Sequence, residues 1–394
     1  MRDSRLASLA SVIVRHCTRV RAGDLVTIVG DPAVMPAVEA VFEAALHAGG
    51  HPSFHAKPES LRRLLLRHGT DEQLGHVCPF EKQRLEACDV LIVLNSKAEP
   101  DGMTIDPRRT AMHQAARRGL LTMSLDRLAR GEARYCLTEL PNAVSARDAG
   151  MTLEEYTDWV FRAGFLHLPD PLAAWHTLHE QHLRMKAHLE RVHTLHFHVP
   201  AHADGPHPHG ETDLTVNVEG RTWLSRAGGE NFPDGELDSG PRSMDGVVHF
   251  THPAVYRNTA VEGVRLVFKD GRVTDASART NEDFLFRMLD MDEGARTAGE
   301  IAFGTNYHIT RFTTNTFFDE KIGGTFHLAL GAGYPETGNA NQSGLHWDMV
   351  CDLRQGGVVT ADGEVIQRDG VFLREGWPKP SSSLPHQPFG ADFA

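Results

Sequence analysis

The chain has 394 residues, 41% hydrophobic and 23% charged, which is the composition of a folded globular protein. This length exceeds one ordinary hydrophobic core, so we expect two domains, residues 1–200 and 201–394. The net charge of −12 with no basic stripe argues against a nucleic-acid partner, and no apolar stretch is long enough to cross a bilayer.

The first half alternates helical and strand patterns. A short β-branched run at 25–29 is followed by a helical pattern that begins at Asp31-Pro32, and further apolar runs occupy 90–94 and 120–123. Continuous apolar strands separated by helices are typical of parallel βαβ units. We therefore predict an α/β N-terminal domain with a parallel sheet.

The second half has a different pattern. A long helical pattern at 172–192 connects the two halves, and a shorter one occupies 281–289. Asp-Gly turns between alternating segments predict hairpins at 264–276 and 358–366. We predict an α+β C-terminal domain with a mainly antiparallel sheet, which ends in a Pro- and Ser-rich tail from Trp377.

Several functional classes lack sequence support. There is no Gly-x-Gly-x-x-Gly after a strand, no P-loop and no Gly-x-Ser-x-Gly elbow. Proline and glycine interrupt the six histidines between 193 and 209, so we expect a solvated loop there and not a zinc site. The five cysteines have no framework spacing and the N-terminus lacks signal-peptide features, which predicts reduced thiols in a cytoplasmic protein.

Acids and histidines recur in the second half within stretches rich in Gly, Phe or small residues. These residues are Glu236, Glu300, Glu320, His327, His346 and Asp348. Such stretches are typical of buried or loop-edge backbone, where acids are rare unless they are paired or bind a metal. Four acids and two histidines in one domain would suit one or two divalent cations. The sequence therefore predicts a metal-dependent enzyme whose second domain carries the metal site.

His346-Trp347-Asp348 is the most specific element of the set. On a strand, positions two apart face the same side, so the imidazole and the carboxylate would converge. The alternative is a cross-strand polar pair on a solvated face. His327 lies between glycines and small residues, which would let a ligand approach closely, but it could equally be a hydrogen-bonded core histidine.

The glutamates and the tyrosine each allow two interpretations. Glu236 alone is typical of an exposed turn acid, whereas the apolar residues after Glu300 indicate a buried carboxylate that needs a partner. Glu320 is either a ligand or the ion-pair partner of Lys321. Tyr334 either donates to an oxyanion beside a metal or packs on the next proline.

The ordered motifs resemble the thermophilic-type metallo-aminopeptidases, the aminopeptidase T and aminopeptidase S group. The motifs are Asn231-Phe232-Pro233-Asp234-Gly235-Glu236, Gly299-Glu300, Phe318-Asp319-Glu320, His327-Leu328-Ala329-Leu330-Gly331, Tyr334 and His346-Trp347-Asp348. The resemblance covers the whole chain and is closest from Thr212 to Val350.

The resemblance implies a two-domain homodimer that removes N-terminal residues from peptides, with two divalent ions (Zn, Co or Mn) in each chain. The implied ligands are Glu236, Glu300, Glu320, His327, His346 and Asp348. Glu300 would bridge the two ions and accept the proton of the attacking water, and Tyr334 would match the catalytic tyrosine of the family.

A second hypothesis remains open at this point. Dihydroxypyridine dioxygenases resemble the same family, and His327, His346 and Asp348 could form the facial triad of a non-haem Fe(II) ring-cleaving enzyme. The additional glutamates favour two metals and hydrolysis.

Overall fold

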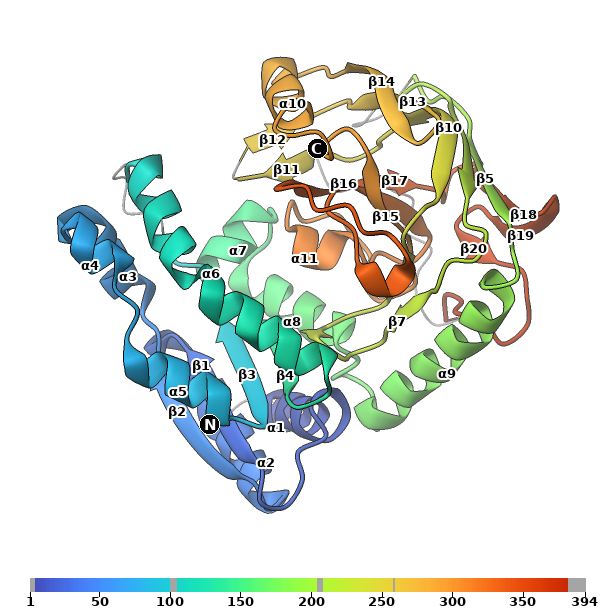
Figure 1. Ribbon diagram of the computed structural model, residues 1–394. Helices are drawn as coiled ribbons and strands as arrows, with labels where there is room; N and C mark the ends of the chain where they lie inside the picture. The colour runs from blue at the N-terminus through green and yellow to red at the C-terminus, as the bar shows by residue number, and fades with distance from the viewer. Residues whose placement is uncertain (1–3, 100–104, 204–207, 258, 382–394) are drawn as a thin grey trace. The chain divides into compact units, whose positions relative to one another are not determined.

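The chain divides into two compact units, and its computed structural model describes residues 4–99, 105–203, 208–257 and 259–381. One unit comprises Met1–Ala173 with Gly228–Pro233, and the other comprises Ala174–Ala227 with Asp234–Ala394 (Figure 1). The boundary therefore lies near the start of the long connecting helix, and a short later segment returns to the first unit.

A five-stranded parallel sheet forms the centre of the first unit, with strand order β2-β1-β3-β4-β8. Its strands are β1 (Leu25–Gly30), β2 (His51–Ala56), β3 (Val90–Asn95), β4 (Arg134–Glu139) and β8 (Asn231–Phe232). Val26, Ile28, Val90 and Ile92 are fully buried on the inner strands, as expected for a parallel sheet. The predicted α/β fold of this half is confirmed.

Helices connect these strands. They are α1 (Ser4–Val12) with a π-helical turn (Ile13–Cys17), a 3-10 turn (Pro32–Val34), α2 (Met35–His47), α3 (Glu59–His68), α4 (Asp71–Gly75), α5 (Pro79–Ala87), α6 (Pro107–Ala129), α7 (Ala143–Asp148) and α8 (Leu153–Ala163). Asp31 caps the 3-10 turn by accepting a 2.9 Å hydrogen bond from Ala33 N, so the predicted start at Asp31-Pro32 is correct.

The prediction of a strand at 120–123 is wrong, because this run lies inside α6. Four apolar residues do not distinguish a strand from a helical segment, and the helix begins upstream, where Asp106 caps Arg108 N at 2.8 Å. The next strand along the chain after β3 is β4, which pairs with it.

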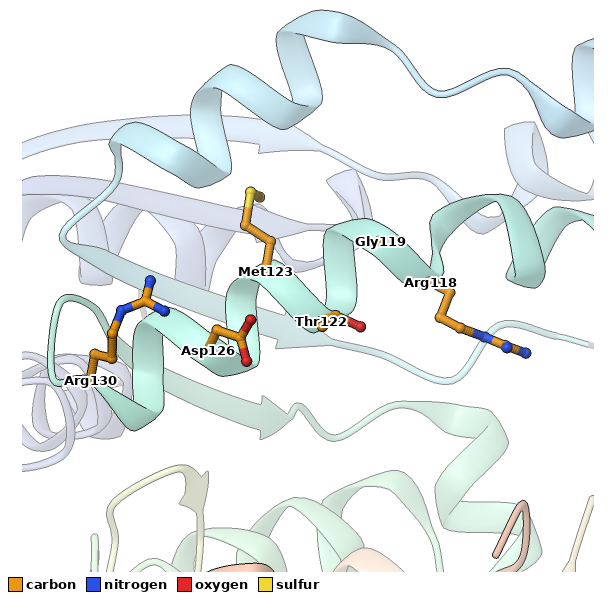
Figure 2. A pocket seen from close by; sticks show the side chains of 6 residues that line it. All are labelled: Arg118, Gly119, Thr122, Met123, Asp126 and Arg130. Atoms are coloured by element: carbon orange, nitrogen blue, oxygen red, sulfur yellow. The ribbon is translucent and has the colours of Figure 1, made fainter. Parts of the chain in front are cut away.

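The α6 residues that line an open surface depression are Arg118, Gly119, Thr122, Met123, Asp126 and Arg130 (Figure 2).

Antiparallel sheets dominate the second unit, as predicted. One has the order β14-β13-β10-β6-β5-β18-β19-β20, a second has the order β17-β16-β15-β9-β7, and β11 pairs with β12. The strands are β5 (Thr194–Val199), β6 (Thr212–Asn217), β7 (Leu224–Arg226), β9 (Glu236–Ser239), β10 (Ser243–His249), β11 (Ala254–Tyr256), β12 (Thr259–Val261), β13 (Arg265–Lys269), β14 (Arg272–Ser277), β15 (Ala298–Gly304), β16 (Thr325–Gly331), β17 (His346–Asp352), β18 (Val358–Ala361), β19 (Glu364–Arg368) and β20 (Val371–Phe372).

The hairpins predicted at 264–276 and 358–366 are the pairs β13–β14 and β18–β19. The helices of this unit are α9 (Pro171–Leu189), α10 (Glu282–Leu289), α11 (Thr316–Asp319) and the 3-10 turn Pro335–Thr337. The loop predicted for the histidines is partly wrong, because His196 and His198 lie on β5 and contact Asp213 and Glu211. None of the helices in the described ranges is long and apolar enough to cross a membrane.

An aromatic layer joins the two larger sheets of this unit. The Phe197 ring from β5 lies 4.4 Å from Phe326 on β16 and 5.8 Å from Phe303 on β15. Because side chains alternate along a strand, this packing leaves the opposite face of β15 and β16 for other residues. That opposite face carries the polar residues described below.

A buried histidine fixes α9 within its unit. His182 is fully buried, with Nδ1 3.1 Å from Ser225 Oγ and Nε2 2.7 Å from Thr305 Oγ1. Burial, together with nearby His179, lowers the pKa of His182 from 6.5 to about 3. The imidazole is therefore neutral in the folded protein at pH 7.

We expect the free energy of unfolding to fall as the pH drops from 6.5 towards about 3, because unfolded His182 gains a proton that the folded state resists. His182→Gln cannot titrate, so the acid dependence should become shallower in this variant. Urea unfolding at pH 7 and pH 5 measures the difference. The control is His176→Gln, at an exposed position of the same helix, and an identical effect in both variants would contradict the assignment.

Candidate metal centre

One face of the sheet β17-β16-β15-β9-β7 gathers the residues that the sequence predicts as metal ligands. Glu236 lies on β9, Glu300 on β15, His327 on β16, and both His346 and Asp348 on β17. Between them, Leu237, Phe303, Phe326 and Trp347 occupy the core-facing positions. Glu320 comes from outside the sheet, as the residue that ends α11.

Strand register explains why these side chains meet. Ala329 pairs with Glu300 on one side and Asp348 on the other, so the two acids share a row with only a methyl group between them. His327 pairs with Ala302 in the next row. Small residues on the central strands keep this face open between the longer polar side chains.

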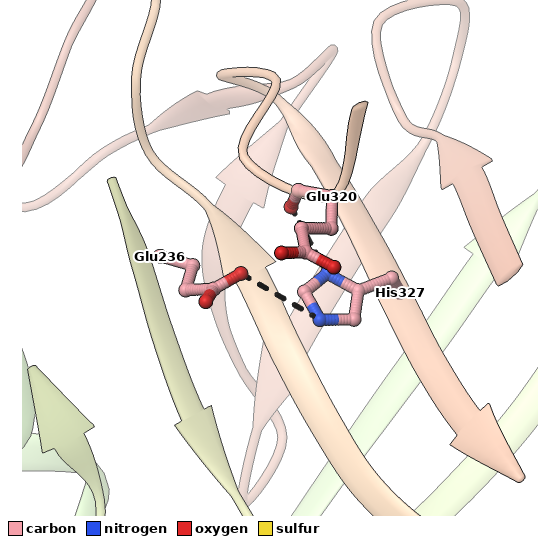
Figure 3. Close-up of side chains that lie close together, drawn as sticks. All are labelled: Glu236, Glu320 and His327. Carbon is pink, nitrogen blue, oxygen red and sulfur yellow. Dashed lines mark hydrogen bonds and ion pairs between the residues drawn. The ribbon is translucent and has the colours of Figure 1, made fainter. Parts of the chain in front are cut away.

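One candidate ligand group consists of Glu236, Glu320 and His327, each of which offers an atom within 4.8 Å of the others. Figure 3 shows the two carboxylates and the imidazole directed toward one another from β9, the end of α11 and β16. The distance from His327 Nε2 to Glu236 Oε2 is 3.8 Å. This Oε2 is buried and has no hydrogen-bond partner among the described residues.

A second group, Glu300, His327 and Asp348, meets the same criterion and shares its histidine with the first. His327 Nε2 lies 3.4 Å from Glu300 Oε1. His346 Nε2 lies 3.7 Å from Glu300 Oε2 and 3.5 Å from Asp348 Oδ1. The structure thus brings all six predicted residues together in one cluster.

Backbone carbonyls orient both imidazoles. His327 Nδ1 lies 3.0 Å from the Glu320 carbonyl oxygen, and His346 Nδ1 lies 3.0 Å from the Ala332 carbonyl oxygen. A carbonyl only accepts, so each Nδ1 donates and each ring directs its Nε2 to the carboxylates. This arrangement is typical of metal-ligating histidines. The donor set therefore fits a divalent cation.

Negative charge exceeds positive charge in and around the cluster. The carboxylates are Asp234, Glu236, Asp238, Glu300, Glu320 and Asp348. The permanent cations are Lys321, which contacts Glu320, and Arg226, whose Nε lies 3.0 Å from Asp238 Oδ1. Burial raises the pKa of Glu320 to about 8 even though Lys321 opposes the shift. Burial also raises the pKa of Asp234 to about 7.

Sequence reasoning missed part of this arrangement. Asp238 could have been found, because it lies two residues after Glu236 on the same strand and therefore shares its face. Arg226 carries no local signal, since only the pairing of β7 with β9 brings it to the cluster. Lys321 is the ion-pair partner of Glu320 that the sequence offered as an alternative to metal binding, but its complete burial carries no local signal.

Tyr334 lies beside the cluster, where the chain leaves β16 and enters the 3-10 turn. Its ring meets His346 edge-on at 5.7 Å between centroids, and Arg226 Cζ lies 5.3 Å from the ring centre. Tyr334 is 37% exposed, and partial burial of its phenol group, with Glu300 and Asp348 nearby, raises its pKa. The phenol therefore keeps its proton and can donate a hydrogen bond.

Comparison with known proteins defines the class of this chain. Residues 2–374 match the family described as thermophilic metalloprotease (M29), so the chain belongs to that family. This membership confirms the family predicted from the motifs and identifies the chain as a metallo-aminopeptidase of family M29.

Individual relatives agree with this class. The chain is 26% identical to Aminopeptidase 2 of Geobacillus stearothermophilus over 95% of this chain and 98% of the relative. It is 33% identical to Aminopeptidase T of Thermus thermophilus over 47% of each chain. The structure of wild-type AmpT from Thermus thermophilus has a TM-score of 0.77 at 23% identity, over 94% of this chain and 99% of that one.

A second solved structure shares the fold at greater distance. This is 2,5-dihydroxypyridine dioxygenase of Pseudomonas putida KT2440, with a TM-score of 0.56 at 12% identity, over 95% of this chain and 99% of that chain. A likeness at this identity concerns the fold alone.

The register at Ala329 gives a direct test of the site. Ala329→Leu should weaken binding of Zn²⁺ or Co²⁺ about tenfold or more, because the larger side chain would separate Glu300 from Asp348. Equilibrium dialysis with metal analysis measures the loss, and circular dichroism checks the fold. Ala329→Gly, which leaves the space open, is the matched control and should bind as the wild type. Equal binding by all three proteins would contradict this geometry.

Proposed function

We propose that the protein hydrolyses the N-terminal residue from peptides at a centre of two divalent metal ions. The main support is the composition of the cluster, in which two ligand groups meet at His327. With all six carboxylates ionised, the two permanent cations leave four negative charges, which is the charge that two divalent ions would neutralise as they displace the protons of the carboxyl groups. The predicted set of Glu236, Glu300, Glu320, His327, His346 and Asp348 would hold them.

Glu300 is the proposed bridge between the two positions. Its Oε1 faces His327 and its Oε2 faces His346, so its two oxygens are directed to different halves of the cluster. Glu236 and Glu320 would complete one half, and Asp348 the other. When bound, divalent ions at such a site polarise a carbonyl group and acidify water.

The side chains of the chain itself supply the remaining steps. Glu300, at the centre of the cluster, accepts the proton of the attacking water. Tyr334 donates its phenol hydrogen to the oxygen on which negative charge develops. The N-terminal amine of a peptide would bind near one metal position or at one of the carboxylates, which favours removal of terminal residues over internal cleavage.

Substitution of the β17 ligands tests the proposal. His346→Ala and Asp348→Ala should each abolish turnover of aminoacyl-anilides while the fold is retained, because each removes a metal donor at the centre. Tyr334→Phe should reduce kcat about 100-fold or more, as expected for loss of one oxyanion donor, and should leave metal binding intact. Full activity in either β17 variant would count decisively against the site.

Metal content of the wild type separates hydrolysis from oxygenase chemistry. About two Zn, Co or Mn ions per chain support the peptidase, whereas one oxygen-sensitive iron would support ring cleavage through His327, His346 and Asp348.

We further propose that the protein is a homodimer and that the second copy covers α5 and α6. No residue of α5 is buried, and only Leu120 is buried along the 23 residues of α6. Phe80, Leu121 and Leu125 are 77%, 60% and 55% exposed. Exposed apolar side chains of this size on adjacent helices are typical of an association surface.

Leu125→Glu should convert the dimer to a monomer, because a carboxylate would be buried between the two copies. Light scattering coupled to size-exclusion chromatography measures the mass. The control is Leu46→Glu on α2, where the leucine is 53% exposed. A wild-type protein that is monomeric at micromolar concentration would refute the dimer.

A further inference from the structure

Lys321 lies inside the candidate metal centre. Its side chain has no solvent exposure, and its Nζ contacts Glu320 Oε1 and lies 3.7 Å from Glu236 Oε1. Glu236 and Glu320 are two of the three residues in one candidate ligand group. A lysine that is buried beside two carboxylates stays charged, and its ammonium group interacts with both of them.

The backbone holds this ammonium group in a fixed position. Lys321 follows directly after α11, and its amide donates to the Phe318 carbonyl at 3.0 Å. Its own carbonyl accepts from Asn306 N at 3.1 Å, and the Phe317 ring lies 5.4 Å from Nζ. Since both the backbone and the side chain are enclosed, the ammonium group cannot turn away to solvent when a metal ion enters.

The two halves of the cluster therefore differ in charge. Glu236 and Glu320 share one buried ammonium, so this group of three has a charge of −1 once both carboxylates are ionised to bind a metal. Within the described part of the chain, Glu300 and Asp348 form ion pairs only with the imidazoles of His327 and His346. Like charges a few ångström apart repel strongly at low dielectric, so a divalent ion near Lys321 meets an opposing charge.

We propose that Lys321 is a built-in third cation of the centre, which makes the Glu236–Glu320 position the weaker and more readily exchanged of the two metal positions. This inference rests on the proposed two-metal function. It assigns Lys321 a positioning and charge-balancing role, and it explains how Glu236 and the partly buried Glu320 remain close together before a metal binds.

Removal of the charge should change metal binding in one half of the site. The test compares Co²⁺ titrations of the metal-free wild type, Lys321→Met, Lys321→Arg and Lys186→Met, followed by calorimetry and by Co²⁺ absorption. Lys321→Met preserves most of the side-chain volume and should tighten the weaker binding step about tenfold or more. Lys321→Arg keeps the charge and should retain the wild-type affinities. Lys186→Met, in a partly exposed ion pair on α9, is the control.

Thermal unfolding provides a second readout. Without metal, Lys321→Met should have a lower Tm than the wild type because two buried carboxylates lose their cation; added Co²⁺ should then raise its Tm by more than it raises that of the wild type. If Lys321 had only a structural role, Lys321→Met would lower the Tm by the same amount with and without metal. Should Lys321→Met not fold without metal, Lys321→Gln is titrated under the same criteria.

The outcomes separate this inference from the function on which it rests. Two binding steps in the wild type, with the weaker one unchanged in Lys321→Met, would overturn the role of Lys321 and leave the two-metal centre standing. One step in the wild type and two in Lys321→Met would overturn the two-metal function of the native enzyme and support Lys321 as the occupant of the second position. One step in both proteins would overturn both proposals.

Discussion

The structure of the second unit depends on the concentration of buried negative charge on one face of a sheet. Six carboxylates lie in and around the cluster with only two permanent cations. Separating these groups from water costs free energy that their own hydrogen bonds do not offset, as illustrated by the buried Oε2 of Glu236, which accepts no hydrogen bond from any described residue. The surrounding fold must be stable enough to hold this arrangement before any cation arrives.

The opposite face of the same sheet provides that stability. Phe303 and Phe326 are fully buried and pack against Phe197 of the neighbouring sheet. Burial of a phenylalanine side chain contributes about 1.5–3 kcal/mol relative to exposure. Strand alternation therefore places a strongly stabilising core side chain next to each destabilising site residue, so that Trp347, for example, separates His346 from Asp348 along β17.

Local sequence patterns predicted much of this arrangement. The x-Asp-Gly-x hairpins, the α10 helix and the convergence of His346 with Asp348 follow from turn chemistry and from the two-residue period of a strand. The patterns failed where tertiary context decides. The apolar run at 120–123 fits a strand or a helix equally well, and only the surrounding residues of α6 select the helix. Pairing of β4 with β8 joins residues about ninety positions apart, which no local pattern encodes.

Local sequence patterns also fail to predict the burial of Lys321 in the candidate site. A glutamate beside a lysine is usually a solvated pair, and the sequence gives no sign that Lys321 is fully buried and Glu320 partly buried. Backbone hydrogen bonds with Asn306, which is distant in sequence, hold the segment after α11 in place. The ammonium then belongs to the candidate metal centre and not to the surface.

Charge also bears on the choice between the two chemistries that share this fold. His327, His346 and Asp348 could serve either a facial triad or half of a two-metal centre, so these three residues do not distinguish an oxygenase from a hydrolase. The remaining carboxylates bear on this choice. A single divalent ion at the triad would leave two of the four excess negative charges without a partner in the protein interior. Each such charge would have to take up a proton or be stabilised at a cost of several kcal/mol. Lys321 neutralises one carboxylate of the Glu236–Glu320 pair and leaves the other for a cation, which favours hydrolysis at two metals.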